Sequence, residues 1–346
     1  MNPISRAEQF KTLFPHEPAF RIQQIEKALF DEKINGWLET TTLPKAIRET
    51  LDKNVPWITC VEAKVFQSSR KDTFKALLKT SDNHLFESVL MANKRGQWTI
   101  CVSSQIGCAM KCVFCATGTM GLKRSLLADE ISDQYRFWKK FLCQHPEVPQ
   151  RISNVVFMGM GEPLANYDNV KKAINTWLAY TDLGPTRITV SSVGLLTLLD
   201  QLLTDPDWPH IRIAISLHSA NQERRKEIVP TTIPDFLIKL ADWSHRYAKI
   251  LGNRRHHITY EYTILSGIND TDEVARELAT YIKKTAYSKI NIIPYNTVPG
   301  KPFERSQQDR ITRFKDILRS HNIDVTQRKT MGDDISAACG QLVTEN

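Results

Sequence analysis

The chain has 346 residues, of which 41% are hydrophobic and 24% are charged, and its formal net charge is +8 at pH 7. These values indicate a globular protein of about two domains, and the excess of positive charge favours a polyanionic partner. No stretch approaches the ~18 apolar residues of a membrane span, and the N-terminus lacks the apolar core of a signal peptide. We therefore expect a cytoplasmic protein that does not enter a membrane.

The first 55 residues are expected to form a helical module. Hydrophobic side chains recur at helical spacing in 16–31, and a threonine cap with a proline in the first turn predicts a helix in 40–53. Residues 56–98 then predict a small β meander that links this module to the rest of the chain. The expected strands of this region are 60–66, 74–80, 85–93 and 97–103.

Residues 99–346 alternate between β-like runs and longer amphipathic stretches. The expected strands are 99–103, 154–159, 187–192, 211–218, 258–265, 289–294 and 322–327. The helical candidates between them are 127–142, 168–180, 234–251, 272–284 and 306–321. Strand–helix alternation of this length is typical of a parallel sheet, and six or more consecutive units predict an α/β fold with a partial (βα)6-type barrel.

Polar motifs follow the ends of these expected strands. A group of cysteines follows the first run, Gly-Glu-Pro follows the second, and Ser191, His218 and Asn296 end or follow later runs. In a parallel barrel the C-terminal ends of the strands share one face, which carries the active site. Polar residues end strands in many proteins, so one such motif would mean little. Five motifs in phase predict one functional mouth.

Cys108, Cys112 and Cys115 are spaced C-x3-C-x2-C, and Cys101 lies seven residues ahead of them. The odd total of seven cysteines argues against a disulfide framework and favours metal binding or reactive thiols. Thiolates select zinc or iron–sulfur clusters. A [4Fe–4S] cluster with three cysteine ligands would leave one iron open, whereas a structural zinc site would need a distant His or Cys as its fourth ligand.

With Phe114 before its last cysteine, this motif resembles the radical S-adenosylmethionine (SAM) superfamily, in which SAM chelates the open iron. The wider sequence resembles the RlmN/Cfr family of RNA methyltransferases from about residue 15 to the end. The stretches that carry this resemblance are 101–124, 155–170, 215–221, 291–300 and 328–342. The resemblance implies a partial radical SAM barrel over 99–346 and an RNA-positioning role for the module 1–55.

The resemblance also implies ligands for two cofactors. Cys108, Cys112 and Cys115 match the ligands of a [4Fe–4S] cluster. The matches to SAM-binding residues are Gly161, Glu162, Ser191, Ser216, His218 and Asn296. Their chemistry agrees, because a carboxylate pairs with the ammonium group of SAM while hydroxyl and amide groups bind its ribose.

Two more cysteines match residues that react in this family. Cys339 corresponds to the cysteine that takes a methyl group from one SAM molecule, and a second SAM then supplies the radical that activates this methyl group. After the carbon has added to an adenine, Cys101 forms a disulfide with Cys339 and releases the methylated RNA. Glu87 matches a glutamate proposed as the proton acceptor, a role for which Cys101 is a second candidate.

The expected product is C2-methylated adenosine in 23S rRNA and in tRNA. The stretches 161–164 and 328–334 resemble RlmN, whereas 115–134 and 335–342 resemble Cfr, whose C8 methylation confers antibiotic resistance and is the alternative. The expected partners are RNA and an electron donor such as flavodoxin or ferredoxin, and the protein is expected to be a monomer.

Two other classes of function stay open. A radical SAM enzyme acting on a non-RNA substrate would not need the pair Cys101 and Cys339. A non-catalytic RNA-binding protein would carry a structural metal and would not bind SAM. Two basic pairs, Lys123–Arg124 and Arg328–Lys329, are expected near the mouth, where they would contact phosphates.

Overall fold

A single ten-stranded sheet forms the centre of the computed structural model, which describes residues 3–93, 95–252 and 256–344. Its strand order is β1-β2-β3-β4-β7-β8-β9-β10-β11-β12, and a separate two-stranded sheet pairs β5 with β6. The strands are β1 (Cys60–Gln67), β2 (Thr73–Thr80), β3 (Leu85–Ala92), β4 (Trp98–Cys101), β5 (Gln105–Gly107), β6 (Leu122–Ser125), β7 (Ile152–Phe157), β8 (Ile188–Ser192), β9 (Arg212–Ser216), β10 (Ile258–Ile264), β11 (Ser288–Pro294) and β12 (Asp324–Gln327).

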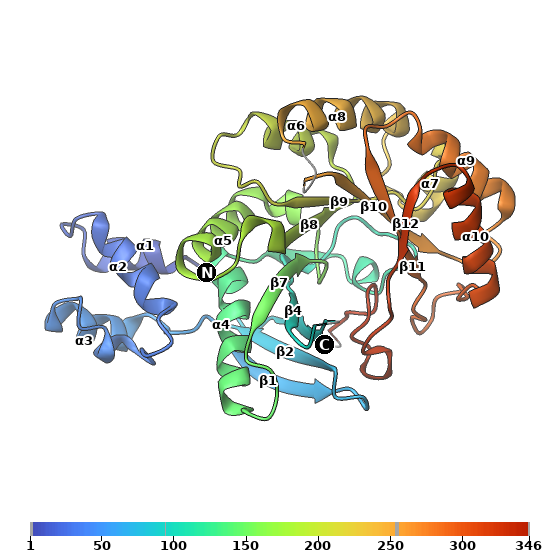
Figure 1. Ribbon diagram of the computed structural model, residues 1–346. Helices are drawn as coiled ribbons and strands as arrows, with labels where there is room; N and C mark the ends of the chain where they lie inside the picture. Colours follow the sequence, from blue (N-terminus) through green and yellow to red (C-terminus); the bar gives the residue numbers. More distant parts are fainter. Residues whose placement is uncertain (1–2, 94, 253–255, 345–346) are drawn as a thin grey trace.

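Two kinds of strand pairing meet at β4. Strands β1 to β4 pair antiparallel as a meander, whereas β4 and β7 to β12 pair parallel in chain order. The seven strands expected from 99–103 onward are therefore confirmed, and they curve into a partial barrel with helices outside (Figure 1). Because β4 belongs to both halves, the meander extends the barrel sheet.

The helices mostly follow the sequence periodicity. They are α1 (Arg6–Leu13), α2 (Phe20–Leu29), α3 (Lys45–Asn54), α4 (Ala128–Gln144), α5 (Tyr167–Tyr180), α6 (Leu196–Thr204), α7 (Gln222–Ile228), α8 (Phe236–Ile250), α9 (Asp272–Ile282) and α10 (Gln308–Ser320). The short helices α6 and α7 were not expected from the sequence. The expected threonine cap of α3 is wrong, since Pro44 precedes its first residue and no side chain caps it.

The N-terminal module has a hydrophobic core of its own, which includes Trp37 and Leu51. A buried ion pair joins this module to the barrel, because Arg6 at the start of α1 reaches Asp133 in α4. The other carboxylate oxygen of Asp133 accepts a hydrogen bond from Arg136 at 2.6 Å. Asp133 is fully buried, and its ion pair with Arg6 fixes α1 against α4, while Arg136 of α4 itself supplies a second cation.

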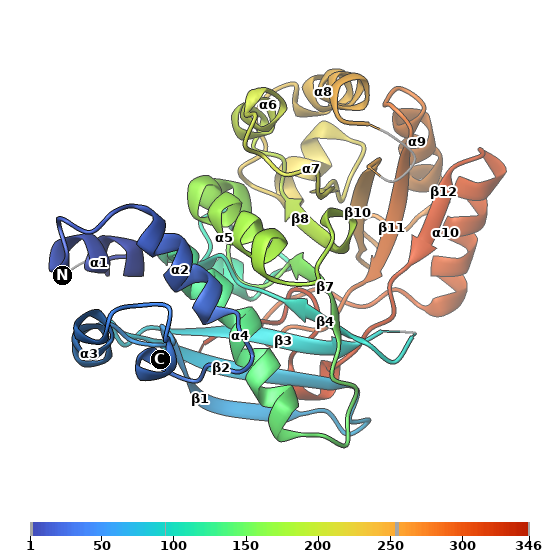
Figure 2. The same ribbon diagram turned by 60° about the vertical axis from the view of Figure 1, so that its left-hand side comes forward.

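The meander and the barrel share one larger core. This core contains residues of β2 and β3, such as Phe74 and Phe86, together with residues of the parallel strands and their helices. Figure 2 shows α4 lying across β1 to β3, which explains how one helix covers both parts. The edge-on contact of Phe74 with Phe141 of α4, at 5.1 Å between ring centroids, is one example of this packing.

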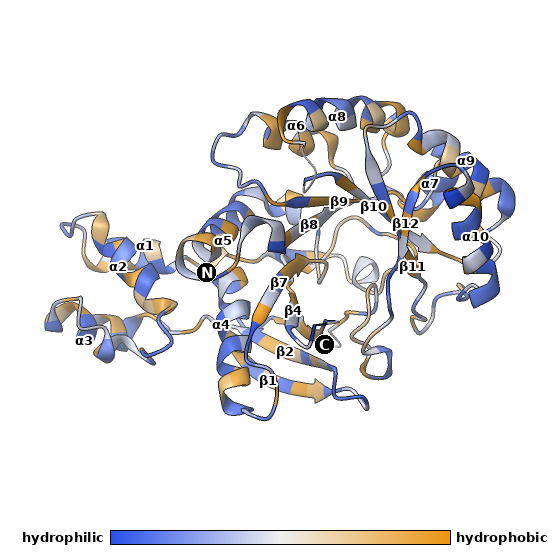
Figure 3. Cartoon of the chain, in the orientation of Figure 1, coloured by the Kyte–Doolittle hydropathy of each residue, from blue (hydrophilic) through white to orange (hydrophobic). Residues whose placement is uncertain are grey.

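Hydrophobic residues concentrate on the strands, whereas the outer helix α10 is largely hydrophilic (Figure 3). This distribution is expected of a sheet covered by amphipathic helices. Within the described ranges, no helix has the length and apolar character needed to cross a membrane.

Candidate active site

The three closely spaced cysteines lie in a hairpin loop between β5 and β6. The loop is closed where the Cys108 N–H donates to the Gly121 carbonyl at 2.9 Å. Gly107 makes this crossing possible, because its φ is +79° and a Cβ atom there would lie 1.8 Å from the Gly121 oxygen. A second contact fixes the tip of the loop, since the Val113 N–H donates to the Ile228 carbonyl of α7 at 3.1 Å.

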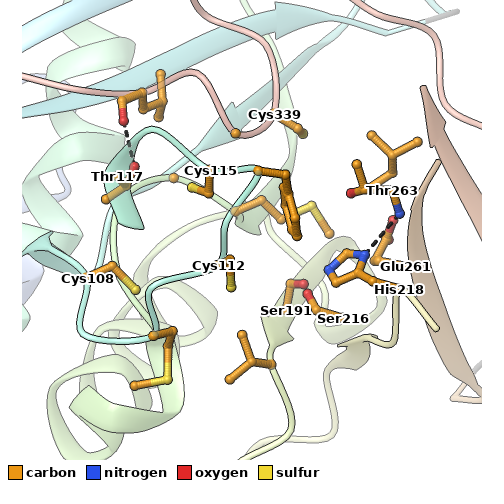
Figure 4. Close-up of a pocket in the computed structure, with 18 of the residues that line it drawn as sticks. Cys108, Cys112, Cys115, Thr117, Ser191, Ser216, His218, Glu261, Thr263 and Cys339 are labelled. Atoms are coloured by element: carbon orange, nitrogen blue, oxygen red, sulfur yellow. Dashed lines mark hydrogen bonds between the residues drawn. The ribbon is translucent and has the colours of Figure 1, made fainter. Parts of the chain in front are cut away.

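Cys108, Cys112 and Cys115 line the same cavity, whose volume is about 150 Å³ (Figure 4). Burial raises the pKa of Cys108 to about 12 and also raises those of Cys112 and Cys115, so metal binding must displace their protons. Among the described residues, no group of three His, Cys, Asp or Glu side chains is arranged to share one metal ion. A structural zinc ion needs four ligands, whereas three thiols in one lining match a [4Fe–4S] cluster that keeps one iron open.

Gly161 and Glu162 follow β7 and line the same cavity. Gly161 has a φ of +97°, and a Cβ atom there would lie 2.5 Å from the Cβ of Gln105. The Glu162 carboxylate accepts hydrogen bonds from the N–H groups of Val193 at 2.8 Å and Leu164 at 3.0 Å. Burial raises the pKa of Glu162 to about 7, so an incoming cation would favour its ionised form.

Ser191, Ser216 and His218 lie at the ends of β8 and β9 and also face this cavity (Figure 4). Burial lowers the pKa of His218 to about 3, which leaves the imidazole neutral. Its Nδ1 accepts a hydrogen bond from the Thr263 N–H at 3.0 Å, and its ring packs edge-on against Phe114 at 4.7 Å. His218 is therefore a fixed neutral group with one nitrogen left for another partner.

We call the loop 108–121, which carries the three cysteines, the cluster loop. We define the C-terminal segment as residues 332–344, which lie against the cluster loop. The Ala116 N–H donates to the Gly340 carbonyl at 2.7 Å, and the Thr117 hydroxyl donates to the Leu342 carbonyl at 2.6 Å. On the other side of the segment, the Asn296 amide donates to the Cys339 carbonyl at 3.0 Å. These contacts place Cys339 in the lining of the cavity that holds the three cysteines.

Cys101 and Cys339 both line a second cavity of about 490 Å³ that adjoins the first. Both are free thiols in this structure. Burial raises the pKa of Cys101 to about 12, and the neighbouring Cys339 adds to this effect while the charge of Arg328 opposes it. Two cysteines that are 238 positions apart in the chain therefore lie within electrostatic reach of each other.

Glu87 does not face either of the two cavities, as judged from the described residues that line them. One of its oxygens pairs with Lys75 Nζ at 2.8 Å, and the other accepts the Val343 N–H at 2.9 Å. Lys75 also donates to the Ser336 carbonyl at 3.3 Å. The buried pair Lys75–Glu87 thus holds the C-terminal segment on both sides of Cys339.

The structure also reveals site residues that sequence reasoning missed or placed elsewhere. Glu261 in β10 is buried in the lining of the first cavity, at the centre of a strand where no motif marked it. Arg328 reaches Cys339, and Arg124 is bound to Asp82 and Glu130. Both guanidinium groups were expected to contact phosphates, but in this structure each is engaged within the protein. Arg328 follows the last strand of the parallel sheet. The expectation that active-site residues follow strand ends would therefore have identified it.

Comparison with known proteins gives a consistent result. The family model described as the radical SAM superfamily matches residues 102–279. A dual-specificity RNA methyltransferase RlmN of Desulfotalea psychrophila is 37% identical over 335 residues, covering 95% of this chain and 90% of the relative. A probable RlmN of Rhodopirellula baltica is 39% identical over 325 residues, covering 93% of this chain and 84% of that protein.

A solved structure agrees with these relatives. The crystal structure of a radical SAM methyltransferase from Sphaerobacter thermophilus is 35% identical, covers 98% of this chain and 97% of its own, and has a TM-score of 0.87. The expected partial radical SAM barrel is thereby confirmed. This chain belongs to the radical SAM superfamily and, within it, to the RlmN family of RNA methyltransferases.

Proposed function

We propose that this radical SAM RNA methyltransferase methylates C2 of adenosine in 23S rRNA and tRNA through an S-methylcysteine at Cys339. The observation that carries the proposal is the convergence of two distant cysteines, Cys101 and Cys339, on one cavity that adjoins the cavity of the three closely spaced cysteines. Cys339 lies in the lining of both cavities, and Cys101 lies in the lining of the second. A radical SAM enzyme that acted on a substrate without this sulfur chemistry would have no use for such a pair.

The residues present fit both cofactors. We assign the [4Fe–4S] cluster to Cys108, Cys112 and Cys115, since these three thiols line one cavity. We assign SAM to the groups that share this lining, which are Gly161, Glu162, Ser191, Ser216, His218 and Asn296. When bound, the two cofactors supply one-electron cleavage of SAM, for which an electron donor such as flavodoxin or ferredoxin is needed. Two SAM molecules are consumed in each turnover.

Two thiols of the protein, Cys339 and Cys101, carry out the chemistry that its own side chains supply. The Cys339 thiolate forms a bond to the methyl carbon of SAM, and the old bond from that carbon to the sulfonium sulfur breaks. Once this carbon has been joined to the adenine, the Cys101 thiolate attacks Sγ of Cys339. A disulfide forms, the sulfur–carbon bond breaks, and its electron pair takes up a proton to give the methyl product.

Glu87 is proposed as the acceptor of the ring proton, with Cys101 as the second candidate. Both carboxylate oxygens of Glu87 are engaged by Lys75 and by the Val343 N–H. Proton transfer to Glu87 would therefore require the C-terminal segment to move away from it. Cys101 already lines the second cavity, so it needs no such movement.

The choice of C2 over C8 is supported by the relatives. Proteins 36–39% identical over most of this chain carry the name RlmN. The methylated nucleoside in the product distinguishes C2 methylation from the alternative, Cfr-type methylation of C8. An RNA containing the target adenosine, methylated by the purified enzyme and digested to nucleosides, should yield 2-methyladenosine by mass spectrometry, and 8-methyladenosine would overturn the assignment.

The sulfur mechanism is tested by the variant Cys101→Ala. Without the second thiol the carbon–sulfur bond cannot be cleaved, so RNA should accumulate covalently attached to Cys339 and be found there by peptide mapping. Cys143→Ala is the matched control, because Cys143 is exposed on α4 and should leave turnover unchanged. Recovery of only free Cys101→Ala protein, under conditions in which the wild type methylates RNA, would contradict the mechanism.

A further inference from the structure

Arg328 makes an unusual pair of contacts at the edge of the active site. It follows β12, and its N–H donates to the Ile292 carbonyl of β11 at 2.8 Å, which continues the strand pairing. Its side chain turns into the mouth and lines both cavities. Nη1 lies 3.1 Å from Sγ of Cys339, and Nη2 lies 3.0 Å from Sδ of Met158.

Sulfur is a weak acceptor when it is neutral, and a guanidinium prefers carboxylate or phosphate partners. Here both terminal nitrogens contact sulfur atoms. A thiolate at Cys339 would be a far better acceptor than a thiol, because hydrogen bonds between ionised partners are about twice as strong as neutral ones. The position of this cation is therefore explained best if the sulfur beside it carries negative charge for part of the reaction.

Among the described residues, the other charged groups near this contact do not provide a second strong partner for Cys339. Cys101 faces it from β4, but burial raises the pKa of this thiol and disfavours a charge on it before the reaction. Glu261 faces Arg328 from β10 and accepts a hydrogen bond from Asn291 at 2.9 Å. The pair Lys75–Glu87 touches the C-terminal segment at Ser336 and Val343, on either side of Cys339.

The geometry points to Arg328 as the positioning residue that orients Cys339 and stabilises negative charge on its sulfur before methyl transfer. This role rests on the proposed function of Cys339 as methyl acceptor. In that step the thiolate gains the methyl carbon and the sulfonium loses it, so an anion and a cation become two neutral thioethers. The charge-assisted part of the contact with Arg328 ends there, which frees the methylated side chain for the next step.

The test uses the reaction of iodoacetamide with Cys339 in the cluster-containing enzyme, without RNA or SAM. Peptide mass spectrometry follows the Cys339 peptide from pH 5 to pH 10 and counts any methylated fraction separately. Thiolates react and thiols do not, so the rate reports the charge on the sulfur. Arg328→Met should react about 10-fold more slowly than the wild type at pH 7, and the two rates should converge at high pH.

Two further variants separate local charge from general effects. Lys329→Met removes a neighbouring exposed cation and should follow the wild-type profile. Arg328→Lys keeps the charge without the paired donors, so its profile should lie between those of wild type and Arg328→Met. If Arg328→Met lacks the absorbance of the cluster, Arg328→Lys replaces it as the test variant. A wild-type profile in Arg328→Met, or in Arg328→Lys when that is the variant that folds, would overturn the inference.

This outcome is independent of the proposed function. If the wild type fails to methylate RNA while alkylation of Cys339 still depends on Arg328, the proposed function fails and the contact stands. If RNA is methylated but alkylation does not depend on Arg328, the inference about Arg328 fails alone.

Discussion

Glu87→Gln should release the C-terminal segment without unfolding the barrel. The substitution removes the charge from the group that accepts the Val343 N–H at 2.9 Å, and hydrogen bonds to charged groups contribute about 1.5–3 kcal/mol. Because glutamine keeps a neutral oxygen acceptor, the loss is about 1–1.5 kcal/mol, which raises the equilibrium constant for local opening about 5- to 13-fold. Hydrogen exchange of amides in 333–344 should accelerate by about this factor, as measured by mass spectrometry on the native enzyme.

The global cost of this substitution is a separate quantity. It leaves Lys75, whose side chain is 9% exposed, without its counter-ion, and breaking a buried pair costs about 3–5 kcal/mol. The double variant Lys75→Met/Glu87→Met should recover much of the urea midpoint because no buried charge is left, while exchange in 333–344 stays fast. Glu62→Gln, on the exposed side of β1, is the control and should change neither quantity.

The urea midpoint and the exchange rate together distinguish an anchor from a simple counter-ion. If Glu87→Gln lowers the urea midpoint but leaves exchange in 333–344 at the wild-type rate, then the carboxylate only neutralises Lys75. The segment would then be held by its other contacts, such as those with Ala116, Thr117 and Asn296.

Three other predictions concern the cluster loop, the Gly-Glu motif and the N-terminal module. Cys112→Ser should abolish the broad absorbance near 400 nm of anaerobically purified protein, since a thiolate ligand is lost. Gly161→Ala should weaken SAM binding measured by calorimetry, because a Cβ there would lie 2.5 Å from Gln105 at a φ of +97°. Although burial opposes ionisation, Arg6 and Arg136 lower the pKa of Asp133 to about 2. The free energy of unfolding should therefore fall as the pH is lowered from about 4 to about 2. The variant Asp133→Asn should remove this pH dependence.

The barrel could be predicted because its signal is local. Each parallel strand is a short apolar run between amphipathic stretches, and each long helix shows hydrophobic periodicity over more than ten residues. The helices α6 (Leu196–Thr204) and α7 (Gln222–Ile228) were missed because they are short, and three of the seven residues of α7 are arginine or lysine. What holds α7 in place is tertiary: Arg225 is buried and donates to the Val193 and Ser216 carbonyls.

The site was predicted as a set of residues but not as an arrangement. The strand ends and the family motifs named many of the groups that line the first cavity but missed Glu261. The sequence could not show that Glu87 accepts a hydrogen bond from the Val343 N–H, or that the Asn296 amide donates to the Cys339 carbonyl. Arg328 was treated as half of a basic pair, because the fold of the C-terminal segment, which decides its partner, depends on contacts far apart in the chain.

The bond between the Thr117 hydroxyl and the Leu342 carbonyl joins residues 225 positions apart. At about 5–20 residues per second, translation needs about 10 to 45 seconds to travel that distance. During this interval the loop of Cys108, Cys112 and Cys115 has emerged from the ribosome without its cover. Iron and sulfide delivered in that time would meet three thiols that the C-terminal segment does not yet cover.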